Sequence, residues 1–273
     1  LFPYTTLFRS AGKLGSALAA ALRDVGVDVS GPWRRGERMP DADVVLLAIP
    51  ERELAAAAAA IPAGPLLGHC SASASLDLLA PGERFNLHPL MTLNAMTLAG
   101  QANQPSGEAR AGEIFRGAAC AVDSSTERAR DVAMALAERL GMRPVVIPAA
   151  QRPLYHAAAS MTANYLVTLE AAAERLARHT GITRAELAPL ARASLEAWIA
   201  GGFSRAISGP VSRGDDDVVE GQRAAVARAE PALLPLFDAL TIATRDAMHL
   251  TAVPSTDEPD NPATPTLRPE THA

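Results

Sequence analysis

Residues 11–26, AGKLGSALAAALRDVG, form the stretch that decides the fold. Gly12 and Gly15 open an alanine-rich helical pattern that ends at Gly26, a typical residue at a helix C-terminus. With Ser10 in the first position, the turn matches the dinucleotide-binding pattern G-x-G-x-x-G in two of its three glycines. In that pattern the middle glycine lets the backbone approach a pyrophosphate, and the last one lets the helix pack on the preceding strand. The alternative is a glycine-rich turn that binds nothing.

The ten residues before this turn do not look like the buried first strand that the pattern requires. The segment LFPYTTLFRS contains Pro3, two threonines and Arg9 where a central strand is expected to hold Val, Ile and Leu. It resembles the translated read-through of a sequencing adaptor, and the alternative is an unusual but genuine strand with Tyr4–Phe8 as its core. The segment also lacks the basic start, apolar centre and cleavage site of a signal peptide.

Downstream of the turn, short apolar runs alternate with helical patterns as far as residue 150. The run Val44–Ile49, between Asp43 and Pro50, predicts a strand buried on both faces of a sheet. The other predicted elements of this region are strands at 27–30, 66–69, 84–87, 118–122 and 144–147 and helices at 53–60 and 126–140. This alternation predicts an α/β fold, in which a Rossmann-like, mostly parallel sheet occupies residues 1–150.

The pattern changes after Pro153, where strand signals cease. One long helix is predicted over 154–179, a second over 185–200, and a third over 222–250 with breaks near Pro231 and Pro235. These helices predict a smaller all-helical domain at 151–251. Residues 252–273 are rich in proline, threonine and acidic residues, so we expect a disordered tail there.

Composition excludes several functional classes for this chain of 273 residues. A net charge of −5 and a content of only 2 Trp, 3 Tyr and 6 Phe argue against nucleic-acid binding. The two cysteines, Cys70 and Cys120, form neither a disulfide framework nor a metal-ligand spacing, so no metal is expected. No apolar run approaches the ~20 residues of a membrane span, and we expect a cytoplasmic protein.

Two arginines follow the predicted second strand, where NAD-selective sites usually carry an acidic residue that holds the ribose hydroxyl. Bidentate contacts from arginine suit the 2′-phosphate of NADP, the alternative being a solvated basic loop. The ends of the next strands are expected to line the cofactor as well. The predicted NADP-binding residues are Ser10, Ala11, Gly12, Lys13, Leu14, Gly15, Arg34, Arg35, Ala48, Ile49, Pro50 and His69.

Polar residues also mark a candidate site for chemistry. His88 follows a predicted strand, and His156, Ser160 and Asn164 recur every four residues, so they share one helix face within about 80° of arc. The rest of that helix is apolar, and the alternative for the stripe is a hydrogen-bonded core network or a dimer contact. The predicted catalytic residues are His156, Asn164, His88 and Ser160, and the predicted substrate-binding residues are Ser71 and Arg213. For Arg213 the alternative is a plain interhelical loop before an acidic helix start.

Six motifs occur in a distinctive order: GKLGSALAAAL (12–22), VVLLAIP (44–50), GHCSAS (68–73), HPL (88–90), RPLYHAAASMTANYLVTL (152–169) and SGPVSRGD (208–215). Together they resemble the Rossmann-like proteins that carry domain of unknown function 2520. That family resembles the 6-phosphogluconate-dehydrogenase-like group, which includes ketopantoate reductase and pyrroline-5-carboxylate reductase. The resemblance implies a nucleotide-binding domain, a helical domain that forms a homodimer, and an NADP-linked reduction. It implies no particular substrate.

Reduction of a carbonyl also needs a proton donor. Related hydroxyacid dehydrogenases and ketopantoate reductases use a lysine, but the one lysine of this chain, Lys13, lies in the predicted phosphate turn. His156 or His88 is therefore the candidate acid, with Asn164 orienting the substrate. The prediction is an NADP-dependent oxidoreductase that reduces a small keto acid or imine. The alternatives are a non-catalytic dinucleotide-binding sensor or scaffold and a deazaflavin-linked NADP reductase.

Overall fold

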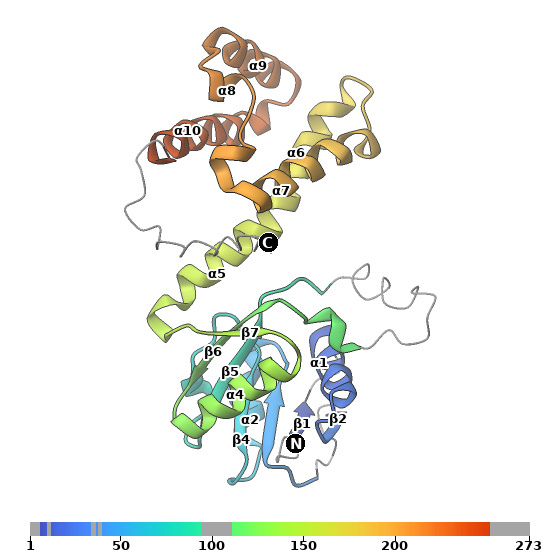
Figure 1. The fold of residues 1–273 in the computed structure, drawn as a ribbon, viewed down its shortest axis with the longest axis vertical. Helices are drawn as coiled ribbons and strands as arrows, with labels where there is room; N and C mark the ends of the chain where they lie inside the picture. Colours follow the sequence, from blue (N-terminus) through green and yellow to red (C-terminus); the bar gives the residue numbers. More distant parts are fainter. Residues whose placement is uncertain (1–5, 10–11, 34–36, 38–39, 94–110, 252–273) are drawn as a thin grey trace, which may run out of the picture. The chain divides into compact units, whose positions relative to one another are not determined.

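The chain divides into two compact units, Leu1–Tyr165 and Leu166–Ala273 (Figure 1). The computed structural model describes residues 6–9, 12–33, 37, 40–93 and 111–251. The sequence predicts a division near residue 150, whereas the units divide after Tyr165. The first helix of the helical region stays with the sheet because side chains of Arg152 and Tyr155 bond to sheet residues and to the loops that follow strands. The predicted tail at 252–273 lies outside the described residues.

The first unit is built on a seven-stranded sheet with the strand order β2-β1-β3-β4-β5-β6-β7. Neighbouring strands from β2 to β5 are parallel, β6 is antiparallel to β5, and β7 is parallel to β6. The predicted mostly parallel sheet is therefore confirmed, with one antiparallel pair that the sequence does not predict. The strands are β1 (Thr6–Arg9), β2 (Val29–Trp33), β3 (Val44–Leu47), β4 (Leu66–His69), β5 (Arg84–Pro89), β6 (Ala119–Ser124) and β7 (Arg143–Val146).

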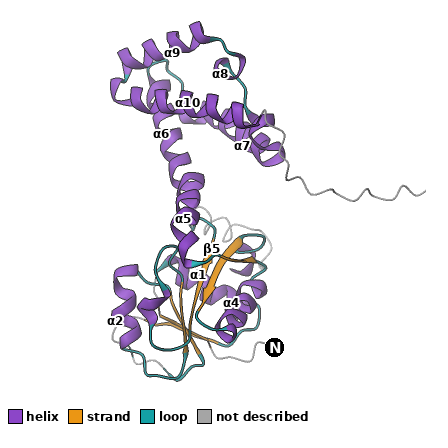
Figure 2. Ribbon diagram, turned by 90° about the vertical axis from the view of Figure 1, so that its left-hand side faces the viewer, coloured by secondary structure: helices purple, strands orange, loops and turns teal. Residues whose placement is uncertain are grey.

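Helices cover both faces of this sheet, as Figure 2 shows with α2 (Leu54–Ala59) on one side and α4 (Glu127–Arg139) on the other. Alternate residues of β3 serve the two faces, as the pleat requires. Val44 and Leu46 belong to the apolar cluster beneath α1 (Lys13–Asp24) and α4, and Val45 and Leu47 to the cluster beneath α2. All four are buried, which confirms the prediction of a strand buried on both faces.

Two positions in the sheet are tightly constrained. A Cβ at Gly68 in β4 would lie 2.4 Å from the ring of the fully buried Phe85 in β5, so only glycine lets that ring cross the strand. Thr6 in β1 is also fully buried, and its Oγ1 has no hydrogen-bond partner. A central β1 thus exists between β2 and β3, with a buried hydroxyl where an aliphatic side chain would fit better.

The second unit consists of helices over its described residues. They are α6 (Leu166–Arg178), α7 (Arg184–Ala206), α8 (Pro210–Arg213), α9 (Asp216–Ala229) and α10 (Leu234–Thr251). The break predicted near Pro231 is confirmed, because α9 ends at Ala229 and α10 starts at Leu234. The break predicted near Pro235 is wrong: this residue lies in the first turn of α10, where the missing proline N–H costs no hydrogen bond.

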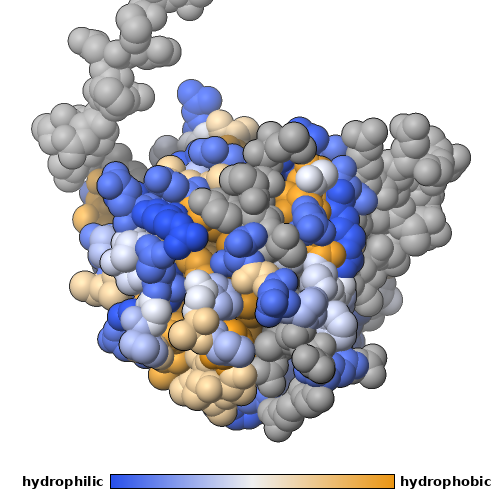
Figure 3. All heavy atoms as spheres, turned by 90° about the horizontal axis from the view of Figure 1, so that it is seen from below, coloured by the Kyte–Doolittle hydropathy of each residue, from blue (hydrophilic) through white to orange (hydrophobic). Residues whose placement is uncertain are grey.

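The described part of the chain contains no helix that is both long enough and apolar enough to cross a membrane. The face of the molecule in Figure 3 carries hydrophilic side chains scattered among apolar ones. Such a mixed surface is ordinary for a protein that buries its largest apolar side chains in a core.

Candidate functional site

The predicted dinucleotide turn lies at the point where the strand order reverses. The chain leaves β1, forms α1 and β2 on one side, and then returns to place β3 on the other side of β1. In such sheets ligands bind beyond the carboxyl ends of the strands at this reversal. Gly12 is the N-cap of α1, and Ala48–Pro50 follow β3, which pairs with β1. Both segments therefore lie at the edge of the sheet where a dinucleotide is expected.

The start of α1 suits an anionic pyrophosphate. Its first turn carries no acidic side chain, Lys13 is exposed at its first position, and Gly15 is buried against the sheet. The N–H groups of a first helical turn have no partner within the helix, and the helix dipole favours an anion there. The predicted residues Ser10, Ala11, Arg34 and Arg35 lie outside the described residues. β2 ends at Trp33, directly before the two arginines.

His69, the last residue of β4, has a fully buried ring that does not reach the surface. Its Nδ1 lies 3.2 Å from the Ser71 N–H and 3.1 Å from the side-chain amide of Asn86, and both groups donate. Nδ1 is therefore the acceptor, and the proton of the neutral ring lies on Nε2. Burial, with Arg152 and His88 nearby, lowers the pKa of His69 to about 3. His69 thus shapes the loop after β4 as a neutral residue.

Asn86 in β5 holds the loop after β4 in place. It is not among the site residues predicted from the sequence. The backbone carbonyls of His69 and Ser71 also lie within hydrogen-bond distance of its side-chain Nδ2, at 3.1 and 2.7 Å, so its two N–H bonds are shared among these carbonyls and His69 Nδ1. The only sign of this role in the sequence is the presence of a polar asparagine within a predicted strand. Ser71, predicted to bind substrate, uses its hydroxyl locally: Oγ donates to the Glu51 carboxylate at 3.2 Å and accepts from the N–H groups of Ser73 and Ala74.

Arg152, the first residue of α5 (Arg152–Ser160), is the second residue that sequence reasoning misses. Its side chain is 4% exposed, and its Nη1 donates to the carbonyls of Ala72 and Ala74 at 3.4 Å. The Nε atom lies 3.6 Å from the Asp123 carboxylate on β6. Burial lowers the pKa of Arg152, and Asp123 opposes that shift. The guanidinium therefore fastens α5 to the loop after β4 and to the sheet.

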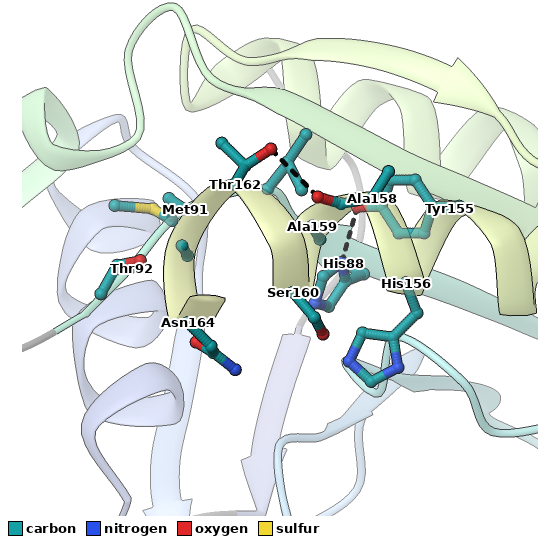
Figure 4. A pocket seen from close by; sticks show the side chains of 12 residues that line it. His88, Met91, Thr92, Tyr155, His156, Ala158, Ala159, Ser160, Thr162 and Asn164 are labelled. Atoms are coloured by element: carbon teal, nitrogen blue, oxygen red, sulfur yellow. Dashed lines mark hydrogen bonds between the residues drawn. The ribbon is translucent and has the colours of Figure 1, made fainter. Parts of the chain in front are cut away.

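A cavity of about 350 Å³ lies between the end of β5 and the helix that Arg152 begins (Figure 4). It brings together all four predicted catalytic residues: His88 from β5, and His156, Ser160 and Asn164 from the helix. In Figure 4 the last three side chains extend from the same side of the helix. The remaining lining residues are Leu90, Met91, Thr92, Tyr155, Ala158, Ala159, Thr162 and Ala163. His69 and Ser71 do not line it.

Tyr155 is the third residue that sequence reasoning misses, although it stands next to His156 in the sequence. Its hydroxyl lies 2.8 Å from His88 Nδ1, and the two rings meet edge to face with centroids 5.7 Å apart. Burial, with His156 and Arg152 nearby, lowers the pKa of His88 to about 4, and burial raises the pKa of Tyr155 to about 12. The hydrogen-bonded pair is therefore uncharged at neutral pH.

The helix changes its winding where it lines the cavity. Residues Met161–Tyr165 form a π-helical turn between α5 and α6, so the predicted uninterrupted α-helix over 154–179 is wrong at this point. Thr162 donates from Oγ1 to the carbonyl of Ala158 at 3.0 Å, which helps to satisfy a carbonyl near the change. π-Helical turns are rare and concentrate at functional sites.

Arg213, the other residue predicted to bind substrate, lies in α8 of the second unit. Its guanidinium pairs with Asp215 at 2.8 Å, and Asp215 makes no side-chain cap on the N–H groups of α9. No group of three or more His, Cys, Asp or Glu side chains within the described ranges is arranged to hold a metal ion.

The part of the chain from β6 to α10 belongs to a recognised domain. Residues 118–244 match the domain of unknown function (DUF2520). This match confirms the resemblance over the segment that contains Tyr155, His156, Ser160 and Asn164. None of the curated protein sequences matches the chain.

Solved structures extend the likeness to nearly the whole chain. A Bacteroides fragilis protein described as a candidate NADP oxidoreductase is 18% identical, covers 90% of this chain and 99% of its own, and superposes with a TM-score of 0.71. An imine reductase from Streptomyces aurantiacus is 18% identical over the same shares, with a TM-score of 0.55.

Plasmodium falciparum pyrroline carboxylate reductase, solved with NADP bound, is 12% identical, covers 90% of this chain and 98% of its own, and has a TM-score of 0.51. At these identities the likeness shows the fold: a Rossmann-like domain precedes the helical part of the DUF2520 domain.

Proposed function

We propose that this protein is an NADP-dependent oxidoreductase that reduces the C=O or C=N group of a small molecule. The observation that carries the proposal is the cavity at the end of β5, where His88, Tyr155 and Asn164 face one space in the same unit as the dinucleotide turn. A reductase needs both features at the carboxyl edge of one sheet. The NADP oxidoreductase and reductase folds that the chain resembles support the same assignment.

The cofactor is proposed to bind with its pyrophosphate at the first turn of α1, where Gly12, Lys13 and Gly15 offer backbone N–H groups and a positive charge. Arg34 and Arg35, after β2, are proposed to select the 2′-phosphate of NADP. Ala48–Pro50 lie at the end of the strand next to β1, so they are proposed to line the nicotinamide side.

When bound, the reduced nicotinamide supplies a hydride to the substrate carbon. The protein must then supply a proton to the oxygen or nitrogen that gains negative charge. The neutral His88–Tyr155 pair is proposed to present that proton, with solvent restoring it afterwards, and His156 is the other candidate donor. Asn164 and Ser160 are proposed to orient the substrate by hydrogen bonds.

The test is NADPH oxidation by the purified full chain with a panel of ketones, keto acids and cyclic imines, followed by NADPH absorbance. We expect turnover with at least one compound and at least a tenfold fall in kcat/KM for each of His156→Ala, Asn164→Ala and Tyr155→Phe. Glu138→Gln, exposed on α4, is the matched control and should leave turnover unchanged. Wild-type turnover that survives in all three cavity variants would remove this cavity as the site.

We also propose that the protein is a homodimer formed through its helical unit. Trp198, Leu190 and Ile199 are 51%, 69% and 69% exposed on α7, which is an unusual concentration of large apolar side chains at a surface. A second copy of the same helices offers a matching apolar surface, as two-fold association requires.

A further inference from the structure

The walls of the cavity carry an unusual electrostatic feature. Its twelve lining residues, all within the described part of the chain, include no Arg, Lys, Asp or Glu. Five are apolar: Leu90, Met91, Ala158, Ala159 and Ala163. The others offer hydroxyl, amide or ring groups, which donate and accept hydrogen bonds without a permanent charge.

Two titratable groups on the walls, His88 and Tyr155, do not supply a charge either. His88 and Tyr155 form a hydrogen-bonded pair in which both rings are uncharged near pH 7, since the pKa of His88 is lowered and that of Tyr155 is raised by burial. His156, the third titratable group, is exposed, so water and salt screen its interactions.

Arg152 and Arg213 already bind other groups of the protein. Arg152 does not line the cavity: its guanidinium is buried, with Nη1 bonded to the carbonyls of Ala72 and Ala74, Nε beside the Asp123 carboxylate and Nη2 without a hydrogen-bond partner. Its charge is therefore partly balanced before a ligand enters. It is near enough to His88 and Tyr155 for its charge to act to lower the pKa of both side chains. Arg213 is paired with Asp215 within the second unit.

We infer that, if this protein is the reductase proposed above, its cavity takes an uncharged substrate, such as a neutral ketone, amide-bearing carbonyl compound or cyclic imine, and excludes carboxylates. An anion that leaves water for this cavity loses hydration and meets no cationic side chain among the described lining residues, so its binding is disfavoured. A neutral C=O or C=N group loses less, and the Tyr155–His88 pair, Ser160 and Asn164 replace its hydrogen bonds to water. The sequence predicts a small keto acid or imine, and the cavity favours the uncharged members of that set.

The experiment compares carboxylate substrates with neutral relatives that lack the negative charge. One pair is 2-oxopentanoate and 2-oxopentanamide, in which an amide replaces the carboxylate at nearly equal size, and the other is 1-pyrroline-5-carboxylate and 1-pyrroline. NADPH oxidation is measured at pH 8, above the ordinary pKa of histidine. We expect kcat/KM for the neutral member to exceed that of the carboxylate at least tenfold in each pair. A carboxylate that is used as well as, or better than, its neutral partner overturns the inference and leaves the proposed reductase standing.

A positive charge placed in the cavity should weaken this preference. In Ser160→Arg the new guanidinium would lie on the cavity wall, and the ratio of neutral to carboxylate kcat/KM should fall at least tenfold. Thr162→Arg is a second variant for the same purpose, in case the first does not fold. Ala56→Arg, exposed on α2 and outside the cavity, adds the same charge and should keep the wild-type ratio.

Binding separates the inference from the proposed function. Calorimetric titration of the NADP-loaded protein with each pair should detect the neutral compound at concentrations where the carboxylate does not bind. If no compound of the broad panel is reduced, the proposed function fails, and the titration still decides whether the cavity prefers neutral ligands. Equal or stronger binding of the carboxylates would overturn the inference.

Discussion

The two units of this chain use their apolar side chains in opposite ways. In the sheet unit the largest side chains, Phe85 and Phe115 among them, are fully buried between the strands and the covering helices. Over the described residues of the helical unit only Val219 and Val226 are buried, while Trp198 and its neighbours on α7 are exposed. The sheet unit thus contains an extensive core, whereas the helical unit leaves many of its large apolar side chains exposed. The candidate site lies in the unit that is internally stabilised.

The largest effect is expected for Phe85→Ala, because Phe85 fills the space above Gly68 at the centre of the sheet. Removing a buried phenylalanine from a well-packed core costs about 3–5 kcal/mol. Val226→Ala, in the sparser interior of the helical unit, should cost less than half as much. Both values come from chemical denaturation monitored by circular dichroism. Equal losses for the two variants would contradict the contrast between the units.

Acid should destabilise the sheet unit through its two buried histidines. His69 and His88 have pKa values of about 3 and 4 in the folded protein, below the 6.5 of a free histidine. The unfolded chain therefore binds protons that the folded chain does not, so stability is complete above about pH 6.5 and falls as the pH drops toward 4. Each histidine contributes a slope of up to about 1.4 kcal/mol per pH unit.

This pH dependence is measured by denaturant titrations between pH 8 and pH 4. The double variant His69→Gln/His88→Gln should lose most of the extra slope, whereas His179→Gln, exposed in the helical unit, should retain it. An unchanged slope in the double variant would show that these two rings do not carry it.

The proposed dimer gives a smaller and more local effect. Trp198→Glu places a charge in the apolar surface of α7 and should weaken association by about 2 kcal/mol, which sedimentation velocity detects as a shift toward monomer. Val146→Glu, at a comparably exposed apolar position in β7, is the matched control and should leave association unchanged. A wild-type chain that is monomeric at high protein concentration would contradict the dimer.

The smallest predicted effect has the opposite sign. Thr6→Val removes the buried hydroxyl of β1 that lacks a partner and keeps the side-chain shape, so it should stabilise the protein by about 1 kcal/mol. Thr126→Val is the same substitution at the N-cap of α4, where Oγ1 accepts from the Ala129 N–H, and it should destabilise by about 1 kcal/mol. The two changes are compared by thermal denaturation. Destabilisation by Thr6→Val would contradict the conclusion that the unpartnered Thr6 hydroxyl lowers the stability of the folded protein.

The features of this molecule that could be predicted are those determined by local sequence pattern. The strand at Leu66–His69 is predicted with its observed ends, and the strand Val44–Leu47 lies within its predicted run. Both predictions succeed because a short apolar run between turn residues is compatible with few structures other than a buried strand. The spacing of His156, Ser160 and Asn164 likewise brings these residues to one cavity, even though a π-helical turn alters the winding between them.

The unpredicted part depends on contacts between distant residues. Tyr155 becomes notable only when the fold places its hydroxyl on His88, 67 positions earlier in the chain. Arg152 would ordinarily be assigned to the surface, and only the meeting of α5 with Asp123 and the loop after β4 gives it a buried place. Asn86, on β5, similarly binds a carbonyl in the loop that follows β4. No periodicity in the sequence predicts these contacts between distant residues.

The most direct test of the central claim is an equilibrium titration of the full chain with NADPH and, in parallel, NADH, followed by nucleotide fluorescence. The account predicts saturable NADPH binding in the micromolar range and weaker NADH binding. Arg34→Ala/Arg35→Ala should reduce the NADPH affinity to that for NADH and leave NADH binding unchanged. Absence of saturable binding for either nucleotide would contradict the proposed NADP-dependent reductase.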